Sequence, residues 1–450
     1  MDPSKPIAIL GGGIAGLSLA HRLHARGRPF VLFEAAADLG GMSRTLRYGA
    51  FGVDTGAHRF HDKDPEITAW AGELLRGAWK QNHKRSAIVA RRRFIDFPLS
   101  PLNVLANVPF TRGVRYVWDF LRRPKLEPDN FRDHALSRFG ASLAEDFVLQ
   151  YSRKLWGVPL ERLSLELGTG RLKNLSLFVV LKEMFLGERR KNEHLDGSFY
   201  YPTGGYGKIV EALLRDLPAE ALKPGQRVTK LERLARGFRV STDRETLECP
   251  VVVGALPLTR LLEMNDWTEP ELKSRAASLK HRHLVAVFVT LNKPEVSPHA
   301  SLYIPDERFP VTRVHEPKQR CPTLAPADQT SLLAEVPLDD ATAAKTATRA
   351  PALEKIRTDT VRQLSEAGLY EPGEVIESHV HIVPNAYPCI TLDAIPVRRA
   401  AVEGLERQPG FYCLGRSARF EYTHLHQIFR ESFTLAEKLA EGKPVAQAVR

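Results

Sequence analysis

Three glycines and one acidic residue near the start of the chain have types and spacing that could hold phosphate and ribose groups. The glycines are Gly11, Gly13 and Gly16, and Glu34 follows after roughly 20 residues. Gly11 permits a sharp turn, Gly13 lets the backbone approach a pyrophosphate, and Gly16 lets a helix pack closely on a strand. Glu34 can accept hydrogen bonds from a ribose hydroxyl group. Together these residues predict a dinucleotide-binding turn.

A strand–helix–strand unit is needed to position these residues, and the surrounding sequence predicts one. The apolar run Ile7–Leu10 precedes the first glycine. Leu17, Ala20 and Leu23 then have helical spacing, and a second apolar run, Phe30–Phe33, leads directly to the acid. The order of strand, glycine turn, helix, strand and acid is that of a βαβ dinucleotide-binding unit.

Two further groups are expected to contact the cofactor. The helix begins at Ile14 and Ala15, where unpaired N–H groups and a partial positive charge favour an anion. A Gly-Gly pair that ends at Gly41 is followed by Met42 and Arg44. Such a loop can approach a cofactor and set a guanidinium group on its phosphate. We therefore expect these five residues to belong to the cofactor site.

The composition is that of an ordinary soluble globular protein with two or three domains. The chain has 450 residues, of which 43% are hydrophobic and 26% are charged. No apolar run approaches the roughly 20 residues that a membrane-spanning helix needs. The first predicted strand begins by Pro6, which leaves no room for a signal peptide before the fold. The four cysteines are scattered without disulfide or metal spacing, which favours a cytoplasmic location.

A formal net charge of +11 favours anionic partners, whether phosphorylated substrates, nucleic acid or anionic lipid. The basic residues form short clusters rather than one aromatic-rich stripe, so a solvated basic face is preferred over nucleic-acid binding. The sequence has no supported nucleophile–base pair, no metal-ligand spacing and no P-loop. We therefore expect a cofactor to supply the chemistry, without a metal.

The pattern along the chain predicts an α/β protein with a helical insertion and a β-rich region. Residues 98–194 have helical periodicity, with amphipathic helices at Val114–Leu121 and Leu143–Leu149. We expect this insertion to form a lid, although the apolar and basic mix of 102–121 is also compatible with membrane attachment. Residues 276–374 are expected to form a β-rich substrate domain. The dinucleotide-binding domain then comprises three segments, 1–97, 195–275 and 375–450.

Shorter patterns predict individual elements in the second half of the chain. Expected strands lie at 227–231, 238–240, 251–255, 283–291 and 331–336, and expected helices at 208–217, 353–367 and 425–441. A segment rich in proline and charge, 316–328, predicts a surface loop. An apolar strand at 410–414 precedes Gly415 and Arg416.

The opening of the sequence resembles that of flavoproteins with the glutathione-reductase fold. The amine oxidases, protoporphyrinogen oxidases, phytoene desaturases and UDP-galactopyranose mutases also begin with GxGxxG, an acid and a Gly-Gly…Arg loop. The resemblance implies a glutathione-reductase-type, Rossmann-like domain that binds FAD, with a helical insertion and a mixed β-sheet substrate domain. It also implies that a strand holding Val228 contacts adenosine, and that Gly415 and Arg416 return the chain to the flavin.

Five later segments are similar to segments of the UDP-galactopyranose mutases. Each segment is short, but the five occur in the right order over most of the chain. They lie at 56–61 (Gly-x-His-x-Phe-His), 151–157 (Tyr-Thr-x-Lys-x-Trp-Gly), 309–316 (Pro-Tyr-Thr-Arg-x-x-Glu), 386–388 (Tyr-Tyr-Pro) and 415–422 (Gly-Arg…Tyr-Arg-Tyr).

The resemblance to the mutases assigns roles to five residues. It implies that His58 lies near the flavin ring and that Trp156 lines the substrate site. Arg313 would face the reacting sugar and its diphosphate, while Tyr387 and Tyr422 would donate hydrogen bonds to phosphate. An arginine and two phenols suit an oxygen-rich substrate. The expected catalytic residues are therefore His58, Arg313, Tyr387 and Tyr422, and the last three together with Trp156 are the expected substrate contacts.

Two departures from the mutase pattern, and two alternative structural roles for the matching residues, leave the identity of the substrate undecided. Leu175 stands where the mutases have a second arginine for the diphosphate, and His424 stands where they have an acid. Trp156 could instead belong to the core. Arg313 could instead pair with Glu316 on a surface strand. A related sugar, a lipid-linked glycan and a redox substrate are all compatible with these residues.

The sequence therefore favours an FAD-dependent oxidoreductase that acts on an anionic or sugar-containing small molecule through flavin N5. The alternatives are a non-redox sugar-nucleotide pyranose/furanose mutase that uses reduced FAD, and a non-catalytic FAD-binding scaffold. Expected partners are the small-molecule substrate and NAD(P)H or another flavin reductant, without nucleic acid. Peripheral membrane contact and a homo-oligomer are both compatible with the sequence.

Overall fold

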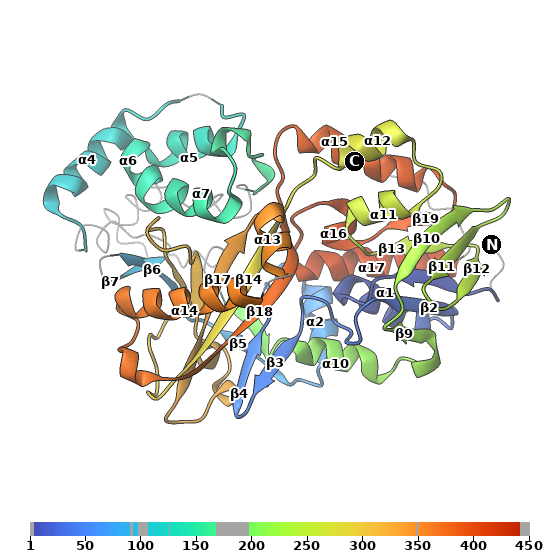
Figure 1. Cartoon of the computed structure of the whole chain (residues 1–450), viewed down its shortest axis with the longest axis horizontal. Coiled ribbons are helices and arrows are strands. Elements are labelled where there is room, and N and C mark those ends of the chain that lie inside the picture. Colours follow the sequence, from blue (N-terminus) through green and yellow to red (C-terminus); the bar gives the residue numbers. More distant parts are fainter. Residues whose placement is uncertain are drawn as a thin grey trace.

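One half of the molecule is built on a five-stranded parallel sheet (Figure 1). The computed structural model describes residues 4–90, 93–97, 107–125, 127–167, 198–347 and 350–441. The strand order is β19–β13–β1–β2–β9, and every neighbouring pair is parallel. The strands are β1 (Ile7–Leu10), β2 (Phe30–Glu34), β9 (Leu222–Pro224), β13 (Val252–Gly254) and β19 (Phe411–Cys413).

Helix α1 (Ile14–His24) links the first two strands and contacts two other helices, α10 (Gly207–Arg215) and α17 (Leu425–Ala440). Its buried face includes Leu17, Ala20 and Leu23, as their helical spacing predicts. The βαβ unit expected from the sequence is therefore confirmed. The other helices of this half are α2 (Pro65–Leu74), α11 (Leu258–Met264), α12 (Pro270–Ala276), α15 (Ala394–Glu406) and α16 (Gly415–Arg419).

The other half contains a seven-stranded mixed sheet in the order β18–β14–β17–β16–β15–β6–β7. All neighbours are antiparallel except β15 and β6. Helix α14 (Ala350–Glu366) contacts β14 and β18, and α13 (Asp340–Ala347) contacts β14. The strands are β6 (Ser86–Ala90), β7 (Arg93–Phe97), β14 (His281–Leu291), β15 (Ser301–Tyr303), β16 (Arg313–His315), β17 (Thr330–Leu338) and β18 (Val375–Pro388).

Sequence segments far apart along the chain contribute to this mixed sheet. The expected strands at 283–291 and 331–336 and the expected helix at 353–367 are confirmed as β14, β17 and α14. Strands β6, β7 and β18 fall within segments that the sequence assigned to the dinucleotide-binding domain, yet they pair here. The domain boundaries themselves stay a prediction.

A group of short helices forms the insertion at the upper left of Figure 1. Helix α6 contacts α4 and α5 and continues through a π-helical turn, η1, into α7. The amphipathic helices expected at 114–121 and 143–149 are thus helical, although the second changes to π geometry at residue 145. The elements are α4 (Phe110–Leu121), α5 (Phe131–Phe139), α6 (Ala141–Ala144), η1 (Glu145–Leu149), α7 (Gln150–Trp156) and η2 (Leu160–Arg162).

Three small sheets complete the described fold. The predicted strands at 227–231 and 238–240 form an antiparallel sheet of their own with β12, rather than joining the parallel sheet. Strand β13 instead returns the chain beside β1. The small sheets are β10 (Val228–Arg233), β11 (Phe238–Thr242) and β12 (Thr246–Cys249); β3 (Thr45–Tyr48) and β4 (Phe51–Asp54); and β5 (Trp79–Asn82) and β8 (Phe199–Pro202).

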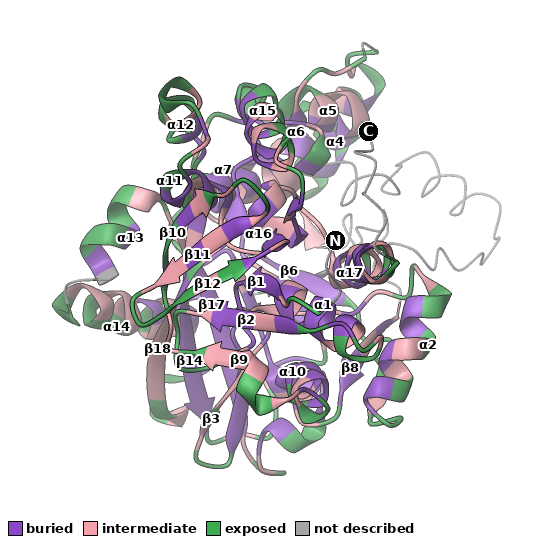
Figure 2. Ribbon diagram, turned by 90° about the vertical axis from the view of Figure 1, so that its right-hand side faces the viewer, coloured by how far each residue is buried: buried purple, intermediate pink, exposed green. Residues whose placement is uncertain are grey.

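The segment 316–328 is only in part the surface loop that its prolines and charges predict. Glu316, Gln319 and Arg320 are buried, and two short 3-10 helices, η4 (Pro317–Gln319) and η5 (Pro322–Leu324), occupy part of the segment. Figure 2 shows the strands of both large sheets mostly buried, whereas helices such as α2 and α14 carry exposed outer faces. Residues 316–321 of the segment therefore lie largely in the interior, whereas Pro322, Thr323, Ala327 and Asp328 are exposed.

Candidate active site

The turn after β1 has the geometry that its glycines predict. Gly11 has a φ angle of 112°, in the left-handed region that favours glycine. Its N–H donates to the Phe33 carbonyl oxygen at 2.8 Å, which joins the turn to β2. A Cβ atom on Gly16 would lie 2.0 Å from the Gly11 carbonyl oxygen. Glycine at this position is therefore required for the close packing of α1 on the turn.

The space beside Gly13 is open. Among the described residues, a Cβ atom built on Gly13 would meet no other atom within 4 Å. Helix α1 begins at Ile14 and has no side-chain cap, so its first N–H groups remain for an anion. A Cβ atom on Gly41 would lie 3.1 Å from the Gly13 Cα atom, and one on Gly415 would lie 2.7 Å from the Ala15 Cβ atom. Three predicted cofactor segments therefore meet at one helix N-terminus.

Charged groups at the rim of this turn suit a phosphate and a ribose. Arg44 donates from Nη1 to Asp38 at 3.1 Å, while its buried Nε has no hydrogen-bond partner within the described chain. Glu34 accepts from the N–H groups of Gly12 and Ala36, at 2.8 Å each. A carboxylate has about four lone-pair sites, so Glu34 keeps acceptor capacity for ribose hydroxyl groups.

These observations fit a dinucleotide along residues 11–16, 34 and 41–44. The open space at Gly13 suits the close approach of a pyrophosphate, and the buried Nε of Arg44 suits an anionic acceptor. Val228 is buried at the start of β10. Its contact with adenosine stays a prediction, as do the roles of the other cofactor residues.

His58 is buried in the loop that follows β4. Its Nε2 lies 2.7 Å from the Met42 carbonyl oxygen, so we assign the proton to Nε2. The imidazole ring stacks on Tyr206 with 4.8 Å between the centroids, and the Arg320 guanidinium donates to the His58 carbonyl oxygen at 2.7 Å. Burial lowers the pKa of His58, which keeps the ring neutral at physiological pH. The ring therefore offers a fixed, uncharged surface.

Arg313 forms a buried ion pair with Glu335 on the neighbouring strand. The Nε and Nη2 atoms of Arg313 donate to the carboxylate at 2.7–3.0 Å, and Nη2 also donates to the Tyr387 hydroxyl at 3.1 Å. Burial, the largest single effect, would lower the pKa of the guanidinium, but the charge of Glu335 and the neighbouring tyrosine side chains together raise it well above its ordinary value. The same carboxylate accepts from the N–H of Ala57 at 3.0 Å. Glu335 thus joins Arg313 to the loop that carries His58.

The predicted substrate residues gather in one group, the aromatic–arginine cluster, which consists of Trp156, Arg313, Tyr387, Arg416 and Tyr422. The rings of Tyr387 and Tyr422 stack with 6.1 Å between their centroids. The guanidinium of Arg416 lies over both rings, 4.9 and 4.5 Å from their centroids. Because Arg416 follows Gly415 at the start of α16, the cluster adjoins the predicted cofactor turn.

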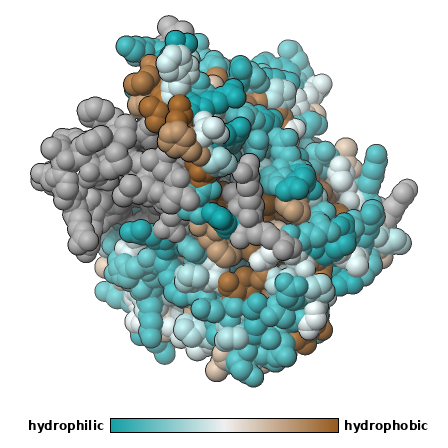
Figure 3. Space-filling view, turned by 90° about the vertical axis from the view of Figure 1, so that its left-hand side faces the viewer, coloured by the Kyte–Doolittle hydropathy of each residue, from teal (hydrophilic) through white to brown (hydrophobic). Residues whose placement is uncertain are grey.

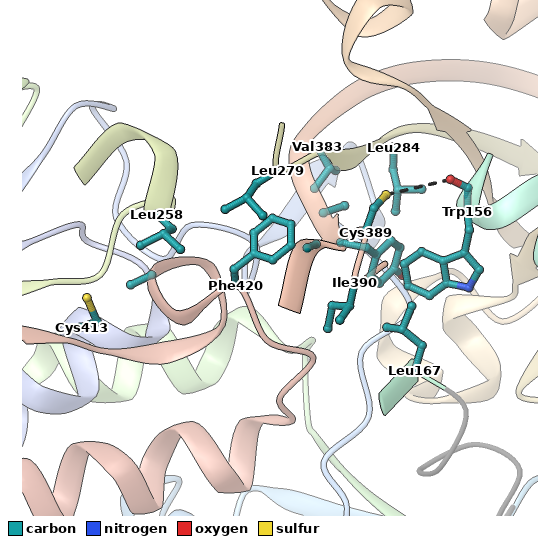
Figure 4. Close-up of a cluster of buried hydrophobic side chains, with 14 of the residues drawn as sticks. Trp156, Leu167, Leu258, Leu279, Leu284, Val383, Cys389, Ile390, Cys413 and Phe420 are labelled. Atoms are coloured by element: carbon teal, nitrogen blue, oxygen red, sulfur yellow. Dashed lines mark hydrogen bonds between the residues drawn. The ribbon is translucent and has the colours of Figure 1, made fainter. Parts of the chain in front are cut away.

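Trp156 is a core residue that also contacts the aromatic–arginine cluster, and its role in lining the substrate site stays a prediction. It is buried in the hydrophobic cluster of Figure 4 with Leu167, Cys389 and Ile390, so it is a core residue. Its indole ring also meets the Tyr387 ring edge to face, with 6.0 Å between the centroids. The tryptophan therefore supports the aromatic–arginine cluster from the side of the helical insertion.

Glu335 is a residue of this site that the sequence reasoning missed. The alternative pairing of Arg313 with Glu316 is wrong, because Glu316 accepts from the N–H groups of Val296 and Ser297. The available signal was the strand Ser331–Val336, in which Glu335 is the lone charge among apolar residues. A carboxylate in a buried strand is costly unless it is paired, so this position predicts a partner.

Lys154 was also missed as a structural residue of the mutase-like segment. Its ammonium group donates to the carbonyl oxygens of Ile304, Asp306 and Val311 at 2.6–2.9 Å. Burial lowers the pKa of Lys154 to about 7. Lys154 therefore fastens α7 to the connection between β15 and β16, close in sequence to Arg313.

Of the two residues that depart from the mutase pattern, only His424 is among the described residues. Leu175 lies outside the described residues. His424 is the N-cap of α17, where its side chain accepts from the backbone of Gln427 and its own N–H donates to the Gln427 side chain at 2.8 Å. The His424 ring meets Tyr422 edge to face with 5.8 Å between the centroids. The imidazole therefore borders the aromatic–arginine cluster.

The fold and the glycine turn define a protein that binds a dinucleotide on a Rossmann-like domain. The chain belongs to the family of flavin containing amine oxidoreductases, whose family model matches residues 14–427. Its dinucleotide is therefore FAD. The expected α/β flavoprotein fold, the FAD cofactor and the resemblance to this superfamily are all confirmed.

Curated relatives match parts of the chain. The protoporphyrinogen oxidase 2 of Arabidopsis thaliana is 30% identical over 160 residues, which cover 34% of this chain and 29% of that protein. The phytoene dehydrogenase of Streptomyces griseus is 28% identical over 280 residues, which cover 56% of this chain and 54% of that protein. The chain thus spans about half the length of these relatives or less.

Solved structures match the fold over nearly the whole chain. A reduced UDP-galactopyranose mutase has a TM-score of 0.83 at 20% identity, with 97% of this chain and 96% of that chain covered. Cyclohexylamine oxidase from Brevibacterium oxydans has a TM-score of 0.70 at 15% identity, with 98% and 99% covered. At these identities the likeness establishes the fold.

A buried histidine beside the cluster predicts a loss of stability in acid. His281 meets Phe420 edge to face, its Nε2 has no partner within the described chain, and burial lowers its pKa from 6.5 to about 4. Between these values the unfolded chain binds more protons, so stability is retained above about pH 6.5 and falls as the pH drops toward 4. When the pH is lowered from about 7 to 5, we expect the wild type to lose about 1–2 kcal/mol more unfolding free energy than the His281→Phe variant.

Urea unfolding of the His281→Phe variant at both pH values measures this difference. Replacement of the exposed His83 by phenylalanine is the matched control for the change of side chain. Equal pH dependence in wild type and His281→Phe would contradict the assignment.

Proposed function

We propose that the protein is an FAD-dependent oxidoreductase that acts on an oxygen-rich, sugar-containing small molecule. FAD, when bound, supplies the two-electron chemistry by accepting a hydride. Residues of the chain bind and orient the substrate and exclude water from the reacting atoms. The observation that carries this proposal is the charge balance at Arg313.

The positive charge of Arg313 is already matched by Glu335. The pair is bidentate and buried, with 14% of the arginine side chain and 2% of the glutamate side chain exposed. A substrate diphosphate at Arg313 would bring further negative charge against the Glu335 carboxylate in a site with little solvent. A neutral or weakly charged substrate meets no such repulsion. This favours a redox substrate with hydroxyl groups over a nucleoside diphosphate sugar.

The aromatic–arginine cluster has groups that suit such a substrate. The phenol groups of Tyr387 and Tyr422 can both donate and accept hydrogen bonds, as sugar hydroxyl groups do. Their stacked rings, with Arg416 over them, present flat apolar surface beside those polar groups. We propose that Tyr387 orients the reacting part of the substrate, because Arg313 fixes the Tyr387 hydroxyl.

Anaerobic photometry tests the proposal. The oxidised holoenzyme is mixed with sugars, glycosides, nucleotide sugars and amines, and the flavin absorbance is followed. We expect bleaching by a hydroxyl-bearing donor, with one oxidised product molecule formed for each flavin reduced. Isomerisation of a nucleotide sugar by pre-reduced enzyme alone, without any donor that bleaches the flavin, would replace this proposal with the mutase function.

The mutase function remains the second candidate because the residues of the mutase-like segments lie together. Nη2 of Arg313 is 3.1 Å from the Tyr387 hydroxyl, and Tyr387 stacks on Tyr422. The fold likeness to a reduced UDP-galactopyranose mutase adds to this support. Turnover that requires reduced FAD and leaves the substrate at its original oxidation level would favour it.

Removal of the Tyr387 hydroxyl should reduce turnover while FAD stays bound. In Tyr387→Phe the ring stack is kept, but the hydrogen bond to Arg313 and any bond to substrate are lost. A hydrogen bond to a charged group contributes about 1.5–3 kcal/mol, so we expect kcat/KM to fall by about 10- to 100-fold. Steady-state kinetics with the donor found above measures the effect.

Tyr370→Phe is the matched control for this substitution. Tyr370 is likewise buried, and its hydroxyl donates to the Val361 carbonyl oxygen at 2.7 Å, beside α14. It should resemble Tyr387→Phe in thermal stability and keep wild-type kcat/KM. If the two variants lost activity equally, the role proposed for Tyr387 would be wrong.

A further inference from the structure

Helix α4 carries a continuous apolar face that is exposed to solvent. The exposed positions follow helical spacing, so their side chains share one side of the helix. The five side chains are Phe110 (84% exposed), Val114 (53%), Val117 (55%), Trp118 (53%) and Leu121 (68%). Five large apolar residues on one short helix are more than the scattered exposed residues that soluble proteins normally carry.

The opposite face of α4 already holds the helix on the protein. Gly113, Tyr116 and Phe120 are buried there, and the Tyr116 hydroxyl donates to Asp146. Arg112 pairs with the same carboxylate. The exposed apolar face is therefore not needed to attach α4 to the insertion, and among the described residues it is left uncovered for a partner.

Basic residues border this apolar face. Between residues 107 and 125 the sequence has five basic residues against one acid, Asp119. The guanidinium of Arg122 lies 3.8 Å from the centroid of the Trp118 ring. Long cationic side chains in this position can keep their charge at a polar boundary while their stems cover apolar surface. The basic residues are Arg112, Arg115, Arg122, Arg123 and Lys125. Arg112 pairs with Asp146 on the opposite face and Arg115 lies 3.8 Å from Asp119, so the basic border rests on Arg122, Arg123 and Lys125.

The position of α4 leaves its apolar face accessible. The helix lies at the outer edge of the insertion, far from the five-stranded sheet (Figure 1). Figure 3 faces this side of the molecule and shows a brown patch in its upper part. The patch is thus at an extremity, where a flat surface could approach it.

We propose that α4 docks the protein on an anionic phospholipid surface. An amphipathic helix with Trp, Phe and Leu on one face and Arg or Lys beside it lies in the plane of the lipid interface, with its apolar face among the acyl chains. At about 1.5 Å per residue, the 12 residues of α4 are about 18 Å long, which suits a helix lying on a bilayer. No helix in the described part of the chain has the length and apolarity to cross one.

Charge favours lipid over a second copy of this chain as the occupant. A symmetric dimer through α4 would place the same basic residues near one another, and like charges repel. An anionic headgroup layer attracts them instead, and each Lys or Arg near such a surface strengthens binding. The apolar side chains and the basic border then supply the two signals that stable peripheral binding requires.

Vesicle co-sedimentation with the holoenzyme tests this proposal. The vesicles are pure phosphatidylcholine, or phosphatidylcholine with about a quarter of phosphatidylglycerol. We expect binding to the anionic vesicles, weak binding to the neutral ones, and release at about 0.5 M NaCl because salt screens the charges. In the double variant Phe110→Ser, Trp118→Ser, binding should fall by about tenfold or more.

Ile376→Ser is the matched control, because Ile376 is also exposed (47%) but lies on β18. It should bind vesicles like wild type. A blue shift of the tryptophan fluorescence on vesicle binding, absent in Trp118→Phe, would show that α4 itself enters the interface. Thermal unfolding confirms that the variants are folded. Absence of vesicle binding by wild type would overturn the proposal, as would a dimer that the double variant abolishes.

Discussion

Replacement of Glu335 by alanine is expected to lower the free energy of unfolding by about 3–5 kcal/mol, because it leaves the buried Arg313 charge without a partner. The loss is large because one carboxylate serves three groups. Two are the Nε and Nη2 atoms of Arg313, and the third is the Ala57 N–H. Urea unfolding followed by circular dichroism at neutral pH measures the change.

Two further variants test whether the loss of stability in Glu335→Ala comes from the unpaired buried charge of Arg313. Glu248→Ala removes an exposed pair with Arg239 on a surface strand, where solvent screens the charges, so its effect on stability should be far smaller than that of Glu335→Ala. The double variant Arg313→Leu, Glu335→Leu removes both buried charges, so we expect it to be more stable than Glu335→Ala alone. A Glu335→Ala variant no less stable than Glu248→Ala would show that water or another residue compensates Arg313.

The βαβ unit could be predicted from the sequence because its signals are local. The turn needs Gly11 and Gly16 for reasons of backbone geometry within a few residues, and the periodicity of Leu17, Ala20 and Leu23 fixes the buried face of α1. The end of β2 then places Glu34 beside the Gly12 N–H. Each step depends on neighbours in the chain, so no tertiary information is needed.

The partner of Arg313 could not be predicted in the same way. Arg313 lies opposite Glu335 because β16 and β17 pair in one particular antiparallel register. Glu316 is only three residues away in sequence, but it is occupied by backbone N–H groups and by Thr330. The choice between the two carboxylates is made by strand register, which single-sequence patterns leave open.

The partly buried segment 316–328 illustrates a second limit. Proline and charge predict exposure because unpaired buried charges are unfavourable. Here the charges are paired with distant groups, since Arg320 donates to the His58 carbonyl oxygen and to Ser301. Burial of Arg320 lowers its pKa to about 10, and the hydrogen bonds compensate part of this cost. The amino-acid composition indicates that burial of these charges is unfavourable. The hydrogen-bond partners that compensate this cost can be identified only in the folded structure.

Replacement of Gly13 by alanine is expected to reduce FAD affinity by about 10- to 100-fold, because a hydrogen bond to a charged group contributes about 1.5–3 kcal/mol. The added methyl group would occupy the open space where the pyrophosphate must approach the N-terminus of α1. The FAD-free protein should accommodate the alanine without strain, since Gly13 has a φ angle of −76° and no described atom lies within 4 Å of the added Cβ atom. Titration of FAD-free protein with FAD, followed by flavin fluorescence, measures the affinity.

Gly373→Ala is the matched control for Gly13→Ala, because a Cβ atom at Gly373 also meets open space among the described residues. Both variants should unfold within about 1 kcal/mol of the FAD-free wild type, since alanine is tolerated wherever the backbone and the space allow it. Only Gly13→Ala should then lose FAD affinity, and added FAD should raise its thermal midpoint less than it raises that of the control. Equal FAD affinity in the two variants would place the pyrophosphate elsewhere. Equal loss of stability without FAD would mean that Gly13 is needed for folding rather than for the approach of the cofactor.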